Sequence, residues 1–324
     1  MMLDLSSAFC HYGACALTVI LPSLGVSFGQ ALTSNSAIKA LNIQPHARNE
    51  INRTLLIALV LIETAAIISF IIGFQLMLFG PHTTFENAAY IHYGEIGIAL
   101  AIGIGGAIAG ALSCLPARQA CLAITRQPFL SNKIQLLMGI TQSLMQTPII
   151  FGLIISLFIL KQLESITHLA DSFRFIGAGL CIGIGSIGPI IGLARLSEEA
   201  CKSVGINRSA FSKILSFTVV SAALIESAII FCLVVALFLL NMKGTPEAAN
   251  SLKYIYLAAG AVMALGTLGV GISSGRLTAQ ACKVFSRKPE LYNEVSKISF
   301  FSQVLIETSA VYALVISVFL LIST

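Results

Sequence analysis

Three glutamates stand alone within long apolar stretches of this chain: Glu63, Glu226 and Glu307. An ionised carboxylate at membrane depth costs about 3 kcal/mol or more, so such residues are rare and usually functional. A carboxyl group that is protonated, or neutralised by a bound cation, tolerates lipid, whereas an ionised one needs water or a positive partner. These residues are therefore suited to taking up and releasing an ion. The competing interpretation is a structural polar contact between helices.

The glutamates belong to a string that recurs four times. Its copies are residues 61–64, 144–147, 224–227 and 305–308, and their third positions lie 83, 80 and 81 residues apart. Recurrence at one repeat position weakens the structural interpretation. In the second copy Gln146 replaces the carboxylate, and a neutral amide cannot release a proton. We therefore predict a degenerate second site at Gln146 and Thr147, with Pro148 kinking that helix.

A polar turn lies at a fixed distance before each string. Eighteen residues before the third positions stand Pro45, Pro128, Arg208 and Pro289. Three of the turns read Ile43-Gln44-Pro45, Arg126-Gln127-Pro128 and Arg287-Lys288-Pro289. The remaining turn, Ile206-Asn207-Arg208, lacks the proline. Each repeat is therefore predicted to be a helix, a turn and a second helix.

Composition places these repeats in a membrane. The chain of 324 residues is 56% hydrophobic and 10% charged, with a mean hydropathy of +0.91, whereas a soluble domain carries about 25% charged residues. A span needs about 20 apolar residues. Eight continuous segments qualify, which predicts an all-α membrane protein with eight transmembrane helices: 10–34, 54–79, 93–115, 134–160, 173–195, 214–241, 255–280 and 298–322.

Charge in the connections indicates the topology. Fifteen of the 19 basic residues lie in or beside the four polar turns, and four lie elsewhere. The positive-inside rule places these turns in the cytoplasm and both termini outside. The bias also accounts for the net charge of +5 without nucleic acid. The predicted units are four tandem hairpins: 1–80, 81–165, 166–245 and 246–324.

Glycine distinguishes the first helix of each hairpin from the second. The first helices of the second, third and fourth hairpins are rich in glycine, for example Gly103, Gly179 and Gly271. Small residues let helix backbones approach closely in lipid. The first helices are therefore predicted to form a packed inner layer. Gln30 and Glu63 are equidistant from the turn, about 25 Å of helix away, so we expect them to face each other.

The cysteines and histidines offer little metal chemistry by sequence. The eight cysteines lie singly in apolar stretches and are expected to be buried free thiols. The five histidines show no i, i+4 pairing and no metal pattern, and Glu95 is expected at the membrane interface. No resident metal or cofactor is predicted.

In the glycine-rich first helix, the Arg126-Gln127-Pro128 turn and the carboxylate 18 residues after it, the chain resembles the c-subunit of F-type ATP synthase, four times over. The resemblance implies a ring of hairpins, a homo-oligomer in membrane lipid, turning against the stator a-subunit and coupled to the central stalk of the ATPase head. The ion carriers would be Glu63, Glu226 and Glu307. The stalk would meet Gln44, Pro45, Arg126, Gln127, Pro128, Arg287, Lys288 and Pro289.

The same resemblance implies a non-catalytic, multi-pass subunit of the bacterial inner (plasma) membrane. With three carriers in four hairpins, the motor is expected to favour ATP-driven pumping over synthesis. If symmetry closes the ring with three chains, the ring contains about twelve hairpins. Three other classes remain open: a V-type proteolipid of an ion pump, a repeat-built secondary transporter, and a structural membrane protein. Secondary transporters often carry inverted repeats around one central site, whereas these repeats share one orientation.

The transported ion is expected to be H⁺, with Na⁺ as the alternative. Sodium-type members of the family combine a first-helix Gln, a Gln one turn before the Glu, a following hydroxyl and a later Tyr. The chain holds parts of this set: Gln30 and Thr64 in the first hairpin, Thr147 in the second, Ser227 in the third, and Gln303, Thr308 and Tyr312 in the fourth. No hairpin is complete, although in the family neighbouring hairpins share ligands.

Overall fold

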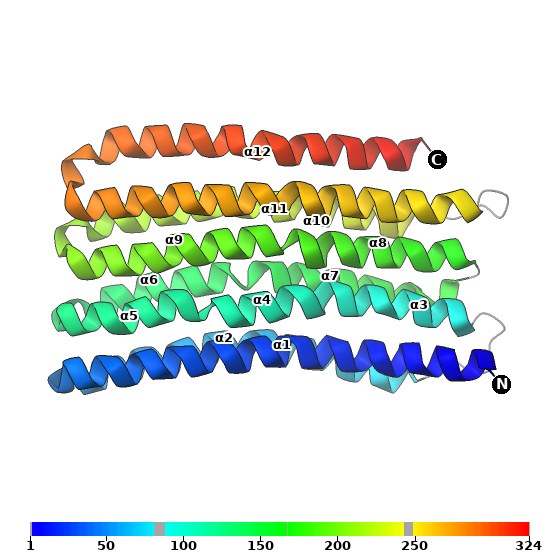
Figure 1. The fold of residues 1–324 in the computed structure, drawn as a ribbon, viewed down its shortest axis with the longest axis horizontal. Helices are drawn as coiled ribbons and strands as arrows, with labels where there is room; N and C mark the ends of the chain where they lie inside the picture. Colours follow the sequence, from blue (N-terminus) through cyan, green and yellow to red (C-terminus); the bar gives the residue numbers. More distant parts are fainter. Residues whose placement is uncertain (1, 81–87, 167, 243–248, 324) are drawn as a thin grey trace.

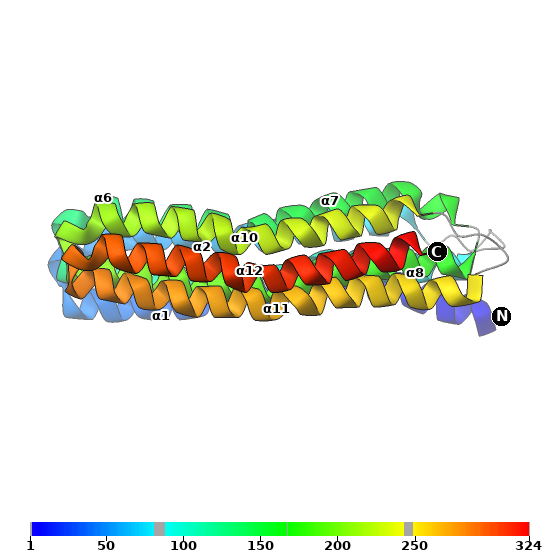
Figure 2. The same ribbon diagram turned by 90° about the horizontal axis from the view of Figure 1, so that it is seen from above.

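The described part of the protein is built from helices running almost parallel to one long axis. A computed structural model describes residues 2–80, 88–166, 168–242 and 249–323, and these contain no strand. Figure 1 shows four antiparallel hairpins side by side, with the hairpin turns at one end and both chain termini at the other. Seen from above in Figure 2, α10, α11 and α12 each run along the long axis of the molecule, whereas α7 covers only part of its length.

Each hairpin consists of a first helix, a one-turn 3₁₀ segment and a second helix. Hairpin 1 comprises α1 (Met2–Ile43), η1 (Pro45–Ala47) and α2 (Arg48–Phe79). Hairpin 4 comprises α11 (Ala249–Arg287), η7 (Pro289–Leu291) and α12 (Tyr292–Ile322). In three of the four turns a proline begins the 3₁₀ segment, where its fixed φ is favourable and no backbone N–H is needed.

The two middle hairpins have interrupted helices. The elements of hairpin 2 are α3 (Ala88–Ile98), the π-helical η2 (Ala99–Ile104), α4 (Gly105–Leu112), α5 (Cys114–Arg126), η3 (Pro128–Leu130), α6 (Ser131–Leu144), α7 (Thr147–Gln162) and η4 (Leu163–Ser165). The elements of hairpin 3 are α8 (Leu169–Gly185), α9 (Ile187–Ile206), η5 (Arg208–Ala210) and α10 (Phe211–Asn241).

Prolines explain three of these interruptions. Pro116, Pro148 and Pro189 lie four residues after Leu112, Leu144 and Gly185, the last residues of α4, α6 and α8. Proline has no N–H to donate to the carbonyl four residues earlier, and its ring clashes with that carbonyl. The kink expected from Pro148 is thus confirmed. Pro22, by contrast, lies inside the continuous helix α1.

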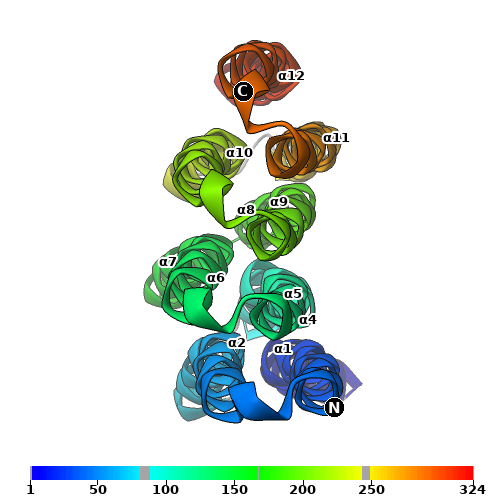
Figure 3. The same cartoon turned by 90° about the vertical axis from the view of Figure 1, so that its left-hand side faces the viewer.

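The helices form two layers. Viewed along the long axis, the first helices stand in one row, and α2, α6, α7, α10 and α12 stand beside them (Figure 3). Glycines bring the first helices close together: a Cβ added at Gly177 would lie 2.6 Å from the Tyr256 carbonyl oxygen, and one at Gly188 would lie 2.5 Å from that of Leu268. The predicted packed layer of first helices is therefore confirmed.

Eight helical segments of the described residues are long and apolar enough to cross a membrane, as the sequence predicts. They are Ala8–Ile43, Pro45–Phe79, Tyr90–Arg126, Pro128–Ser165, Leu169–Ile206, Arg208–Asn241, Ser251–Arg287 and Pro289–Ile322. They are longer than the predicted spans because helix continues through the polar residues near the turns. The unit boundaries at 80, 165 and 245 stay a prediction, because 81–87, 167 and 243–248 lie outside the described residues.

Candidate ion-binding sites

The first site joins the two helices of hairpin 1. Glu63 on α2 is half-buried, and Gln30 on α1 donates a hydrogen bond from its Nε2 to Glu63 Oε2. Gln30 and Glu63 lie equally far from the turn, and their side chains meet as predicted. The Thr64 hydroxyl donates to the Leu61 carbonyl oxygen at 2.7 Å.

The second site lies between hairpins 2 and 3. The Thr147 hydroxyl at the start of α7 donates to Glu226 Oε1 on α10, with 3.0 Å between the two oxygens. Glu226 is half-buried. A residue of one hairpin therefore completes the polar surroundings of a carboxylate on the next, which residue spacing along one helix does not reveal.

The third site lies between hairpins 3 and 4. The carboxyl group of Glu307 on α12 lies beside Ser227 on α10, whose hydroxyl donates to the Leu224 carbonyl oxygen at 2.7 Å. Its Oε1 is buried and has no hydrogen-bond partner among the described residues. The Gln303 amide donates to Ser221 Oγ at 3.3 Å, and Tyr312 is 68% exposed.

The Gln146 side chain of hairpin 2 makes hydrogen bonds to other helices. Its side-chain Nε2 donates to the Leu61 carbonyl oxygen of hairpin 1 at 3.1 Å and lies 3.3 Å from Ser113 Oγ. Gln142, one turn earlier, donates to the Ser113 carbonyl oxygen at 2.9 Å. Gln146 thus links its own first helix to hairpin 1.

One rule describes two contacts between hairpins. The hydroxyl residue that follows a carboxylate position lies beside the carboxylate of the next hairpin, as Thr147 does for Glu226 and Ser227 for Glu307. Thr308 occupies this position on hairpin 4, the hairpin at one end of the row. Hairpin 1, which carries Glu63, stands at the opposite end. Within one chain, Thr308 therefore has no next hairpin and Glu63 has no preceding one.

Side-chain hydrogen bonds also join the turns of neighbouring hairpins. Gln127 donates from its side chain to the Gly205 carbonyl oxygen of hairpin 3 at 3.1 Å, and Asn207 to that of Ser286 in hairpin 4 at 3.2 Å. Of the residues expected to meet a stalk, the exposed ones are Pro45, Arg126, Arg287 and Lys288, and the half-buried ones are Gln44, Gln127, Pro128 and Pro289. Phe129 beside them is fully exposed.

A cluster that sequence reasoning missed lies among the first helices. His11, His92 and Glu95 meet there and are fully buried. The three residues form a group that could hold a metal ion, and Glu95 is buried between helices near the start of its span. His92 and Glu95 stand three residues apart on α3, whereas His11 belongs to α1, so the packing of neighbouring hairpins completes the cluster. His11 and Glu95 are separated by 84 residues, one more than the 83 residues between the first two repeats. This near-equality is the signal in the sequence that could have indicated that the two residues lie at a similar depth.

The cysteine expectation is largely confirmed. All eight cysteines are free thiols, and six of them are buried. Cys10 and Cys15 on α1 are half-buried.

These features define a membrane proteolipid made of tandem helical hairpins with mid-span carboxylates. The family model for the C-subunit of ATP synthase matches residues 13–76, 176–239 and 257–320, together more than half of the chain. The chain belongs to the ATP synthase c-subunit family. The three matched segments lie in hairpins 1, 3 and 4, the hairpins that carry a glutamate at the repeat position.

Curated relatives correspond to one hairpin each. The chain is 31% identical to the ATP synthase c-subunit of Mesomycoplasma hyopneumoniae strain 7448 over 81 residues, 25% of this chain and 79% of the relative. It is 37% identical to that of Dehalococcoides mccartyi strain BAV1 over 71 residues, 22% and 93% of the two chains. The ATP synthase c-subunit of Thermotoga petrophila is 31% identical over 83 residues, 25% and 98% of the two chains.

Family membership and the eight spans make the chain a multi-pass membrane protein and a rotor-ring subunit of a rotary ATPase. The secondary-transporter and purely structural alternatives are thereby disfavoured. The tandem arrangement places three matched family units and one further hairpin in one polypeptide.

Proposed function

We propose that this chain carries H⁺ around a rotor ring on Glu63, Glu226 and Glu307. The observation that carries the proposal is the recurrence of a carboxylate at one repeat position, where a hydroxyl residue of the preceding hairpin lies beside two of the three carboxylates. Each carboxyl group is neutral while it faces lipid and ionises where a hydrated channel meets it. The stator a-subunit would supply these channels.

The ring is completed by further copies of the chain. Thr308 of one copy contacts Glu63 of the next, following the rule that joins the hairpins within a chain. The basic turns, including Arg126, Arg287 and Lys288, face the cytoplasm of a bacterial inner membrane and bind the central stalk. Their exposure and the concentration of basic residues around the turns support this orientation.

Protons are favoured over Na⁺ because the sites hold few oxygen ligands. Sodium, like other hard cations, prefers several oxygen atoms, as the coordination of Ca²⁺ and Mg²⁺ illustrates. Glu226 has one described side-chain partner, Thr147. In hairpin 4 the Gln303 amide donates to Ser221, and Tyr312 is largely exposed.

Hairpin 2 carries no ion, because Gln146 cannot ionise. When fewer ions cross per revolution of the ring, the ring delivers less torque for ATP synthesis. ATP hydrolysis can then drive a steeper ion gradient. The complex is therefore suited to pumping, the activity that a V-type proteolipid would also serve.

The test uses the whole ATPase reconstituted in vesicles. We expect the triple variant Glu63→Gln, Glu226→Gln, Glu307→Gln to abolish ATP-driven ion uptake while ATP hydrolysis by the head persists. The matched control is Glu164→Gln, since Glu164 is exposed in η4, outside the sites. Native mass spectrometry checks that each variant assembles a ring. Ion uptake retained by the triple variant would refute the proposal.

The transported ion is tested separately with a carboxyl-reactive carbodiimide. For a proton ring, Na⁺ at about 100 mM, well above ordinary ion-binding constants, leaves the labelling of all three glutamates unchanged. Protection of Glu63 or Glu307 by Na⁺ would instead establish sodium transport.

A further inference from the structure

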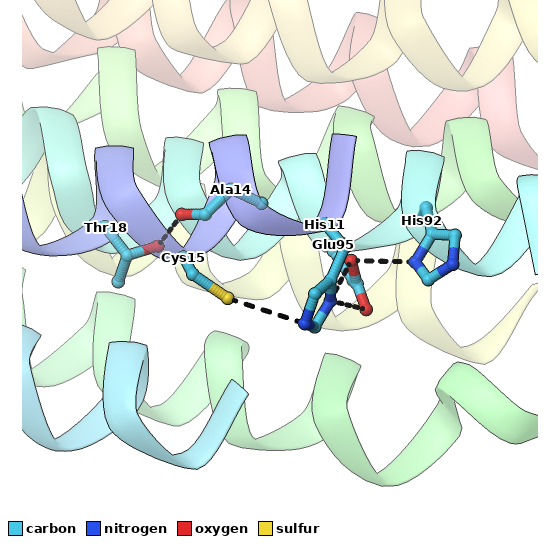
Figure 4. A network of polar contacts seen from close by, with 6 residues as sticks. All are labelled: His11, Ala14, Cys15, Thr18, His92 and Glu95. Carbon is cyan, nitrogen blue, oxygen red and sulfur yellow. Dashed lines mark hydrogen bonds and ion pairs between the residues drawn. The ribbon is translucent and has the colours of Figure 1, made fainter. Parts of the chain in front are cut away.

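A second polar cluster lies on the first helices, away from the carboxylates of the second helices. His11 on α1 and His92 and Glu95 on α3 point toward one another (Figure 4). The His11 Nδ1 atom lies 3.0 Å from both carboxylate oxygens of Glu95, and His92 Nδ1 lies 3.1 Å from Oε2. None of the three side chains is exposed.

The atoms that meet are those a metal ion uses. One ligand atom from each residue lies within 4.8 Å of the others. Two imidazoles and one carboxylate form a ligand set known for Zn²⁺, which leaves the fourth position free for water or another ligand. The arrangement is compact enough that small side-chain movements would place the three atoms around one ion.

Charge favours a cation at this place. A buried carboxylate needs a compensating positive charge. A divalent ion supplies that charge while both imidazoles stay neutral and present their lone pairs to it.

The surroundings of the cluster are suited to orienting a ligand. Cys15 Sγ lies 3.9 Å from His11 Nε2, the ring nitrogen opposite the one facing Glu95. Metal-bound histidines commonly donate their second ring N–H to an acceptor, which fixes the tautomer, and a cysteine sulfur is a weak acceptor of this kind. His92 Nε2 is buried without a described partner. The π-helical segment η2 begins four residues after Glu95, and such segments are frequent at functional sites.

We propose that His11, His92 and Glu95 bind a Zn²⁺ ion through the two Nδ1 atoms and the Glu95 carboxylate. The ion joins α1 to α3 and so fastens hairpin 1 to hairpin 2 at the end of the molecule that holds the termini. Glu95 stands 18 residues before Ser113, which contacts Gln146 at carrier depth, so about 25 Å of helix separates the metal from the carrier level. The site is structural and independent of ion transport.

The experiment measures Zn²⁺ binding to the intact purified ring after treatment with a chelator. We expect one Zn²⁺ per chain by equilibrium dialysis and elemental mass spectrometry. Glu95→Gln and His92→Asn should each weaken binding at least about tenfold, since even loss of an outer partner costs that much. Both replacements retain a polar group at the cluster, which helps the variants fold. His46→Ala is the control, because His46 lies exposed in η1.

X-ray absorption then identifies the ligand atoms. Nitrogen and oxygen neighbours at about 2.0–2.2 Å, without sulfur at about 2.3 Å, are expected. Absence of Zn²⁺ binding by the intact ring would overturn the proposal, leaving a hydrogen-bonded Glu–His cluster. Equal binding by Glu95→Gln, His92→Asn and His46→Ala rings would also overturn it, since the ion would then bind elsewhere.

Discussion

The hydroxyl groups beside the carboxylate positions differ in what they bind. Thr64, Ser227 and Thr308 each donate to the carbonyl three residues earlier in their own helix. Thr147 instead donates to Glu226, because α6 ends at Leu144 and Thr147 begins a new helix. The break that Pro148 imposes on hairpin 2 thus creates a contact with hairpin 3.

Removing that hydroxyl should change one carboxyl group only. In Thr147→Val, Glu226 loses a donor that stabilises its ionised form, so its reaction with a carbodiimide, which attacks the protonated acid, should become up to about tenfold faster. Labelling rates followed by mass spectrometry for each peptide measure the effect. Glu63 and Glu307 should be unchanged, as should all three in the control Thr64→Val. An unchanged rate at Glu226 would show that the bond does not matter for its protonation.

Restoring the missing carboxylate is a second residue-scale prediction. Gln146→Glu keeps the side-chain size and should raise the number of carbodiimide-reactive carboxyls from three to four per chain. It should also raise the number of ions moved per ATP hydrolysed. Intact-protein mass spectrometry counts the labels, and vesicle uptake measures the ratio. A ring with four labels and an unchanged ratio would show that hairpin 2 is excluded from transport for another reason.

At the scale of the helices, the backbones of neighbouring helices approach each other closely at particular glycines. A Cβ at Gly188 on α9 would lie 2.5 Å from the Leu268 carbonyl oxygen and 2.6 Å from its Cα on α11. A Cβ at Gly139 on α6 would meet nothing within 4 Å, and this residue lines an open cavity between α2 and α6. Gly188 in the layer of first helices is therefore intolerant of added atoms, whereas Gly139 on a second helix has room.

The same substitution should have opposite effects at these two positions. Gly188→Ala pushes backbone atoms apart and should destabilise the ring by about 1–3 kcal/mol. Gly139→Ala should stabilise its helix by up to about 1 kcal/mol, because alanine is the better helix former. Thermal dissociation of the detergent-solubilised ring ranks the variants against the parent. Equal stability of the two variants would contradict the two-layer packing.

At the scale of the whole molecule, the row of hairpins has two unmatched ends. Asn207 of hairpin 3 donates to the Ser286 carbonyl of hairpin 4. The equivalent of Asn207 on hairpin 4 is Lys288, and the equivalent of Ser286 on hairpin 1 is Asn42. Both are exposed. These residues should meet where hairpin 4 of one copy adjoins hairpin 1 of the next.

Cysteine cross-linking tests this ring closure. Lys288→Cys with Asn42→Cys should form disulfides between chains, giving a ladder whose longest member reports the number of chains in the ring. Asn207→Cys with Ser286→Cys should cross-link only within one chain and is the matched control. The native thiols are a small background, because six of the eight are buried. A cross-link confined to single chains would contradict a ring closed by these two ends.

The sequence by itself determined the repeat, the eight spans and the carboxylate positions. Each depends on local patterns: an apolar run long enough to span, a polar turn, and a fixed 18-residue offset along one helix. It also placed Gln30 opposite Glu63, because counting residues from a turn fixes depth in a hairpin. The tertiary structure alone decided which hairpins share polar groups. Contacts such as Thr147 with Glu226, or His11 with Glu95, depend on the rotation and register of helices about 80 residues apart in the chain. The residue pattern within one helix does not determine that rotation or register.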